Sequence, residues 1–183
     1  MQRIPSVHPE AAQGSARELL DTVQRAFGLI PNAAKVMAHS PAVLRGFLGF
    51  STAMAEVSIG AKLHAQVKLL TSETNGCEYC SSILSATAGS AGLTDDDILA
   101  GRTGRSDERR TKAALTFAHE VLQRGGKVRD QDLALVREAG FSDAEIVEVV
   151  ASVVLGCFTN FLNNVADTEL DIPRAAPVQS CRS

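Results

Sequence analysis

Signals for helix starts and stops recur along the whole chain and restrict its fold more than any other feature. Ser40 is a capping residue followed by Pro41 at the first helical position, and Ser142 forms a capping box with Glu145. Thr94 precedes three aspartates, whose charges favour the positive end of a helix. Signals for β-strands are nearly absent. The sequence therefore predicts an all-α protein, a bundle of several helices.

Glycines and caps divide the chain into eight expected helical segments. The last segment is apolar over much of its circumference, so we expect it to lie centrally in the fold. Its longest apolar stretch, residues 149–158, is far shorter than the ~20 residues of a membrane span, and we predict no membrane partner. The expected helices cover residues 15–27, 41–56, 61–74, 81–91, 106–124, 130–140 and 142–166, and one more begins at residue 94.

The length of 183 residues suits a single domain with its own hydrophobic core. We expect an N-terminal extension at residues 1–14, a helical domain at residues 15–173 and a flexible C-terminal tail at residues 174–183. Residues 1–14 lack the apolar run of a secretory signal peptide, so we expect a cytoplasmic location. Cysteines in that compartment are reduced unless they carry out redox chemistry.

The charge balance excludes a nucleic-acid partner. Eighteen Lys and Arg residues against 21 Asp and Glu give a net charge of −3, so the chain lacks the clustered positive charge that phosphate binding needs. Aromatic residues are only 4% of the chain, too few for a surface that stacks bases.

Two of the four cysteines, Cys77 and Cys80, are spaced as in a redox-active dithiol. Residues three apart lie on one side of a helical turn, close enough to form a disulfide after a modest backbone adjustment. Asn75 and Gly76 end the preceding helix, so Cys77 begins the next one, where free backbone N–H groups favour a thiolate. The alternative is a pair of small, semi-buried apolar side chains without redox chemistry.

A zinc site is the competing use of such a pair. Structural zinc needs four ligands, which usually come as two pairs, and this chain has a single pair. His64, His119, Cys157 and Cys181 each lack a partner at ligand spacing. We therefore predict neither a metal nor a cofactor.

The residues around the cysteines carry a family resemblance. The run Glu-Thr-Asn-Gly-Cys-Glu-Tyr-Cys at 73–80, followed by a small-residue helix that ends in Gly-Leu-Thr at 92–94, resembles the alkylhydroperoxidase D (AhpD)-like family. Residues 27–32, the Ser-Pro pair at 40–41 and residues 158–173 add to the likeness. The last of these stretches resembles the peroxidase-related branch of the carboxymuconolactone decarboxylase superfamily. The resemblance covers residues 15–173.

This resemblance implies an all-α fold, homo-oligomers such as trimers or hexamers, and thiol-dependent reduction of organic hydroperoxides. It assigns the attack on the peroxide to Cys80, which becomes a sulfenic acid, and the resolving step to Cys77. Cys77 then meets an external reductant, a protein or a small thiol. The family moves protons through a Glu and a His, and this chain has Ala65 and Leu84 at those positions. We therefore expect an oxidoreductase whose peroxidase activity is weak.

Three nearby residues are candidates to support the site. Tyr79 lies between the cysteines and either donates a hydrogen bond to the leaving oxygen or packs with its hydroxyl at the surface. Glu73 reaches the cysteines only if the turn after it folds back, and otherwise is an exposed carboxylate near a helix end. His64 neighbours position 65 but should face elsewhere, since one residue turns ~100° around a helix, and it is expected to be solvated.

Three functions fit this sequence. A dithiol peroxidase explains the retained cysteines. A non-catalytic oligomeric scaffold or binding protein with a degraded site explains the loss of the Glu and the His. A carboxymuconolactone decarboxylase-type enzyme fits less well, because that branch does not depend on a cysteine pair.

Overall fold

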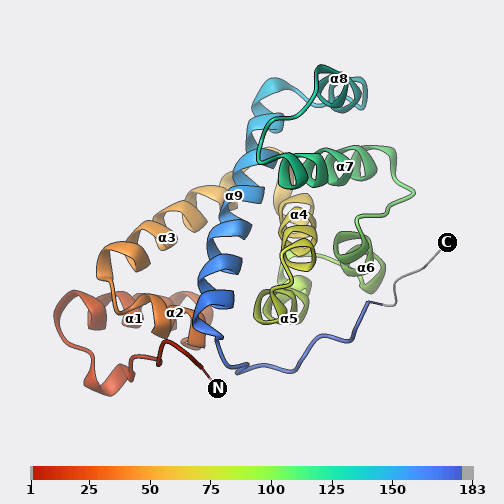
Figure 1. Cartoon of the computed structure of the whole chain (residues 1–183). Coiled ribbons are helices and arrows are strands. Elements are labelled where there is room, and N and C mark those ends of the chain that lie inside the picture. Colours follow the sequence, from red (N-terminus) through yellow and green to blue (C-terminus); the bar gives the residue numbers. More distant parts are fainter. Residues whose placement is uncertain (1, 179–183) are drawn as a thin grey trace.

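The protein is built from α-helices and short 3-10 turns, in agreement with the all-α prediction. The computed structural model describes residues 2–178, and this part of the chain contains no β-strand (Figure 1). The α-helices are α1 (Gly14–Phe27), α2 (Asn32–Met37), α3 (Pro41–Ala53), α4 (Gly60–Thr74), α5 (Glu78–Thr87), α6 (Asp95–Thr103), α7 (Arg109–Arg124), α8 (Asp130–Glu138) and α9 (Asp143–Ala166).

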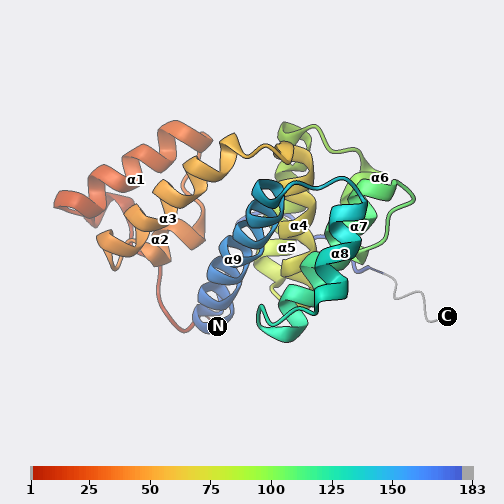
Figure 2. The ribbon, with the colours of Figure 1, turned by 90° about the horizontal axis from the view of Figure 1, so that it is seen from above.

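Helices α4 and α9 form the centre of the molecule, with α4 packed against α5, α6, α7 and α9 (Figures 1 and 2). The main core lies between α4, α7 and α9. A second core joins α1, α2 and α3 on the other side of α9. Typical buried residues of the main core are Val67, Leu70, Leu115, Ala118, Val149 and Val153, and those of the second core are Leu20, Val23, Met37 and Leu44.

A glycine lets the two central helices approach closely beside the cysteine pair. A Cβ atom added to Gly156 on α9 would lie 2.8 Å from Cγ2 of Thr71 on α4. Real Cβ atoms do not come so near, so any larger residue would push the helices apart. The glycine therefore sets the distance across which the polar groups of α4, α5 and α9 meet.

The strongest cap signals are confirmed. The side chains of Thr94 and Ser142 each accept a hydrogen bond from the third residue of the helix, and both form complete capping boxes. Ser40 accepts from the N–H of Val43 at the start of α3. The φ of Gly28 is +75°, the left-handed conformation expected of a glycine that ends a helix.

Several predicted boundaries are wrong. Helix α1 begins at Gly14, so Ser15 lies inside the helix and does not cap it. Helix α7 begins three residues after Ser106, because the carboxylate of Glu108 caps the N–H groups of Arg110 and Thr111. Helix α5 begins at residue 78 rather than 81, directly after Cys77. The sequence analysis also missed the six-residue helix α2, which is held mainly by its packing in the second core.

Helix α9 is the central helix that the sequence predicts, although much of its surface is exposed. In residues 2–178 it alone is long and apolar enough to span a membrane by length and composition, a test that core helices also pass. Val153 and Leu155 are buried, whereas an apolar stripe at four-, three- and four-residue steps is solvent-exposed. This α9 stripe consists of Val154, Phe158, Phe161 and Val165.

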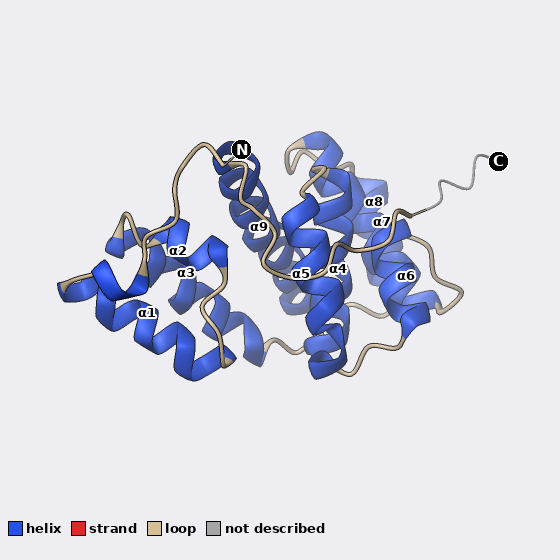
Figure 3. Cartoon of the chain, turned by 90° about the horizontal axis from the view of Figure 1, so that it is seen from below, coloured by secondary structure: helices blue, strands red, loops and turns tan. Residues whose placement is uncertain are grey.

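The N-terminal residues pack at the end of α9, where the chain also leaves that helix towards the C-terminus. The backbone N–H groups of Arg3 and Ile4 donate to the carbonyl of Ala166, so the predicted extension is tied to the domain. Residues 168–178, here called the C-terminal segment, run beneath α5 towards α6 (Figure 3). The predicted tail begins within this segment, where the N–H of Ala175 donates to Ser82 Oγ at 3.0 Å. Residues 179–183, including Cys181, lie outside the described residues.

Candidate functional site

The cysteine pair lies where the turn after α4 folds back on itself. Gly76 has a φ of +60°, a conformation that glycine adopts without strain. The turn brings the N–H of Cys77 to the carbonyl of Ser72 at 2.9 Å. Cys77 then caps α5, because its Sγ accepts the N–H of Cys80 at 3.3 Å. Both side chains are buried free thiols, so the structure shows the reduced pair.

Helix α9 supplies an amide that points at Cys80. The Nδ2 of Asn163 donates to Cys80 Sγ at 3.3 Å. The other end of this amide is fixed, because Thr168 Oγ1 donates to Asn163 Oδ1 at 2.8 Å. Asn160, one turn earlier, donates to Ser72 Oγ and accepts from Asn75. A buried amide network therefore ties α9 to the turn that carries the cysteines.

These hydrogen bonds separate the acidities of the two thiols. The Cys77 thiol donates towards Cys80, and this hydrogen bond, with others from Asn160 and Asn163, lowers the pKa of Cys80 to about 7 against the opposing effect of burial. The same hydrogen bond, together with burial, raises the pKa of Cys77. The predicted helix-start contact is present, because Cys77 Sγ accepts a backbone N–H, but the hydrogen bond to Cys80 and burial outweigh its effect on the pKa of Cys77. Its Sγ receives one backbone N–H, whereas Cys80 collects several donors.

Cys80 opens into the larger of the two cavities that the pair reaches. This cavity, here called the substrate cavity, has a volume of about 590 Å³ and is lined mainly by apolar side chains of α1, α2, α3 and α5. Lys68 of α4 is the only charged residue among the described residues that line it. The apolar residues that line this cavity include Phe27, Leu29, Met37, Phe47, Ile83 and Leu84.

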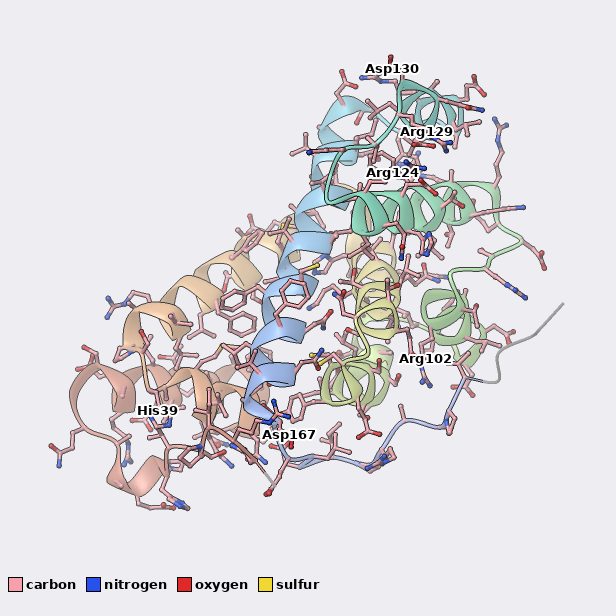
Figure 4. All side chains as sticks on the ribbon, viewed as in Figure 1. His39, Arg102, Arg124, Arg129, Asp130 and Asp167 are labelled. Carbon is pink, nitrogen blue, oxygen red and sulfur yellow. The ribbon has the colours of Figure 1, made fainter. Side chains whose placement is uncertain are left out.

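Cys77 faces a different, more polar cavity. This second cavity, of about 360 Å³, lies between the start of α5, α6 and the C-terminal segment. Arg102 of α6 reaches its edge, where Nε binds Glu73 at 2.6 Å and Nη1 donates to the carbonyl of Ala176 at 2.7 Å (Figure 4). Cys80 and Cys77 thus line two different cavities.

Tyr79 has a structural use that neither sequence interpretation anticipated. Its hydroxyl is buried, donates to Asp171 Oδ1 at 3.0 Å and accepts the N–H of Ala33 at 3.3 Å. The other oxygen of Asp171 accepts the N–H of Asn32 at 2.6 Å. The hydroxyl therefore joins α5, α2 and the C-terminal segment, and burial raises the pKa of Tyr79.

Glu73 and His64 both lie outside the substrate cavity. The folded-back turn places Glu73 beside Cys77 in the second cavity, where it is half-buried and paired with Arg102. His64 is not solvated as expected, because its Nδ1 lies 2.8 Å from Ser152 Oγ on α9. The Ser152 hydroxyl donates to the carbonyl of Glu148, so Nδ1 is the donor to serine. Burial, with the nearby Lys68, lowers the pKa of His64 to about 4.

The two positions that depart from the family pattern lie in the same apolar cluster. Ala65 and Leu84 both pack against the cluster of Leu69, Ala88 and Leu93. The pair of polar residues that the resemblance implies is therefore replaced by a pair of apolar contacts. Nothing in this cluster can accept or donate a proton.

Sequence analysis missed two residues, Asn163 and Lys68, that line the substrate cavity together with Cys80. A detectable signal existed for the first, since two asparagines three residues apart on an apolar helix need buried partners. Lys68 gave no such signal, because it stands among mixed apolar and polar residues, as on an ordinary helix surface. Within residues 2–178, no three His, Cys, Asp or Glu side chains form a group able to hold a metal ion.

The chain matches solved structures over nearly its whole length but no sequence family. No family model and no curated protein matches it. An uncharacterized peroxidase-related protein from Ralstonia eutropha, described as an alkylhydroperoxidase AhpD core, is 23% identical with a TM-score of 0.75. The match covers 93% of this chain and 92% of that one.

Two further structures support this similarity. The debrominase Bmp8, in complex with 2,3,4-tribromopyrrole, is 19% identical with a TM-score of 0.78, over 92% of this chain and 91% of that one. An uncharacterized peroxidase-related protein from Silicibacter is 18% identical with a TM-score of 0.73, over 92% of each chain. The fold of this chain is therefore the AhpD-like, peroxidase-related fold that the sequence resemblance implies.

Proposed function

We propose that this protein is a thiol-dependent peroxidase that reduces organic hydroperoxides through Cys80 and Cys77. The observation that carries the proposal is the position of Cys80, a thiol of lowered pKa that opens into an apolar cavity beside a second thiol. At a pKa of about 7, half of Cys80 is thiolate at pH 7, and the thiolate is the reactive form.

The different pKa values of the two thiols assign each of them a step in the reaction. The Cys80 thiolate attacks the distal oxygen of the hydroperoxide, an S–O bond forms, the O–O bond breaks, and the alkoxide takes a proton and leaves as an alcohol. Cys77 then loses its proton and attacks Cys80 Sγ, and the hydroxyl of the sulfenic acid leaves as water. One hydroperoxide is reduced for each disulfide formed, and an external thiol, from a protein or a small molecule, returns the pair to the dithiol.

The cavity favours an organic hydroperoxide over hydrogen peroxide. A water molecule occupies ~30 Å³ in the liquid. The substrate cavity, of about 590 Å³, is therefore far larger than a molecule as small as hydrogen peroxide requires. Its apolar lining gains free energy by covering hydrocarbon, at ~25 cal/mol for each Å² removed from water. The site therefore binds a bulky, apolar hydroperoxide best.

A second candidate function is reductive removal of a halogen from an aromatic ring. It is supported by the fold shared with a debrominase whose structure holds 2,3,4-tribromopyrrole. The same thiolate would take the halogen as an S–halogen bond while the ring carbon takes a proton, and Cys77 would then release halide by forming the disulfide.

We also propose a cytoplasmic homo-oligomer, of the trimer or hexamer type that the resemblance implies. The α9 stripe supports the assembly, because Phe161 and Val165 are 58% and 62% exposed on a helix that is otherwise central. Exposed apolar surface of this kind marks an interface in many soluble proteins.

Cysteine variants test the proposed reaction and separate the candidates. Cys80→Ser should not react with an organic hydroperoxide, whereas Cys77→Ser should form a sulfenic acid on Cys80 that a trapping reagent labels. Cys157→Ser is the matched control and should behave as wild type. Equal consumption of hydroperoxide by Cys80→Ser would contradict the proposal. Halide release from a bromopyrrole without hydroperoxide reduction would favour the second candidate, and no reaction with either would favour a scaffold.

A further inference from the structure

Lys68 is a cation without a protein partner in the cavity of the reactive thiol. It is half-buried, and within residues 2–178 its ammonium has no hydrogen bond or ion pair. An ammonium carries three hydrogen-bond donors, and that of Lys68 is open to the space of the cavity. Other half-buried charges of this protein are paired, such as Arg102 with Glu73. An unpartnered charge in an apolar cavity therefore points to a role towards a ligand.

The helix geometry places Lys68 next to the missing relay. Residues three apart lie on one face of a helix, so the side chain of Lys68 lies one turn from that of Ala65. Ala65 packs against the apolar cluster, whereas Lys68 lines the substrate cavity with Cys80. Lys68, which can carry a proton, thus lies on the same face of α4 as Ala65 and one helical turn closer to the cysteines.

The electrostatic surroundings make this ammonium the cation that faces the Cys80 thiolate. The charge of that thiolate acts on the pKa of Lys68 by raising it, while burial lowers it more. His64 on the same helix is neutral at pH 7, and Tyr79 and Cys77 on the side of α5 are protonated. From α9 the cavity receives only the neutral Thr159 and Asn163.

We propose that Lys68 is a catalytic residue, the proton donor to the leaving oxygen when Cys80 reduces a hydroperoxide. This inference rests on the proposed function and gives the site an acid in place of the absent relay. As the S–O bond forms and the O–O bond breaks, the negative charge passes from Cys80 Sγ to the departing alkoxide. The Lys68 ammonium transfers one proton to that oxygen, giving the alcohol and a neutral amine, which regains its proton from water.

The proposal also predicts which substrates depend on Lys68. An alkoxide is a poor leaving group and needs a proton as it departs, whereas the carboxylate released from a peroxy acid is stable without one. A positioned acid should therefore matter for alkyl hydroperoxides and hardly at all for peroxy acids.

Variants at position 68 test the inference with two substrates of equal carbon skeleton, an alkyl hydroperoxide and a peroxy acid. Lys68→Met should lower the rate constant for the alkyl hydroperoxide by ~10²-fold or more, the usual contribution of a general acid, and that for the peroxy acid by less than tenfold. Lys68→Arg keeps the charge but holds its proton too tightly, so it should also be slow with the alkyl hydroperoxide. Lys62→Met, also on α4, breaks an ion pair with Asp97 of α6 and is the matched control.

Each variant is first titrated by iodoacetamide alkylation, so that rates are compared at a pH where Cys80 is mostly thiolate. Normal alkylation of Lys68→Met also shows that its site is folded. An equal loss for both substrates, or a wild-type rate in Lys68→Arg, would overturn the role of Lys68 as an acid while leaving the peroxidase intact. Failure of the wild-type protein to reduce either substrate would overturn the proposed function and this inference together.

Discussion

Replacing Asn163 by leucine tests whether the buried amide of α9 stabilises the Cys80 thiolate. The two side chains have the same branched arrangement of four heavy atoms, so the substitution removes the donor at 3.3 Å from Sγ without opening a cavity. Asn163 is 3% exposed, so the leucine side chain also lies in a buried position. The expected result is a higher pKa of Cys80 with little change in fold.

The size of the shift follows from the strength of the hydrogen bond. A hydrogen bond to a charged group contributes ~1.5–3 kcal/mol, and sulfur is a weak acceptor, so the lower end applies. Since one pKa unit corresponds to ~1.4 kcal/mol, the pKa of Cys80 should rise by about one unit. From a starting pKa of about 7, the thiolate fraction at pH 7 should fall from about half to about a tenth.

The assay is a pH titration of thiolate ultraviolet absorbance in a Cys157→Ser and Cys181→Ser background. The raised pKa of Cys77 keeps its titration out of the neutral range, so the transition near pH 7 reports Cys80 alone. Asn164→Ala is the matched control, because this exposed neighbour donates to the turn rather than to sulfur. An unchanged pKa in Asn163→Leu, or the same shift in the control, would refute the assigned role of the amide.

Three further predictions concern reactivity, the relay and assembly. The alkylation rate of Cys80 should rise only about fivefold from pH 6 to pH 7, because a thiol with a pKa of about 7 is already half ionised at pH 7; the roughly tenfold rise of an unshifted thiol in stopped-flow alkylation would contradict this. Adding Ala65→Glu and Leu84→His to Lys68→Met should raise its rate of hydroperoxide reduction at least tenfold, because the two substitutions supply the missing relay. A folded triple variant that is no faster than Lys68→Met in stopped-flow assays would contradict this prediction. Phe161→Asp should lower the mass found by light scattering to that of a monomer, since the α9 stripe would then carry a charge; a wild-type protein of 19.3 kDa at all micromolar concentrations would contradict the oligomer.

The helical architecture could be predicted because its signals are local. Capping boxes at Thr94 and Ser142 involve residues three apart, and the structure has both. The start of α7 was misplaced because Ser106 and Glu108 can both cap, and only the structure shows which side chain reaches the N–H groups. Helix α2 was missed because its six residues owe their conformation to packing against other helices, which has no local signal.

The cysteine pair was found from its spacing, but the acidity of each thiol was not. The helix-start argument favoured a thiolate at Cys77, and it used only groups within a few residues of that cysteine. The structure favours Cys80, because Asn163 is 83 residues away in the sequence and reaches the sulfur only in the fold. Lys68 escaped notice for the same reason, since the cavity it shares with Cys80 is formed by helices from both ends of the chain.

The thiol count after one equivalent of a bulky organic hydroperoxide tests the central claim most directly. The account predicts that free thiols fall from four to two per chain, that one alcohol is released, and that peptide mapping finds a disulfide between Cys77 and Cys80 with Cys157 still reduced. Retention of all four thiols, or their loss without a linkage between Cys77 and Cys80, would contradict the account.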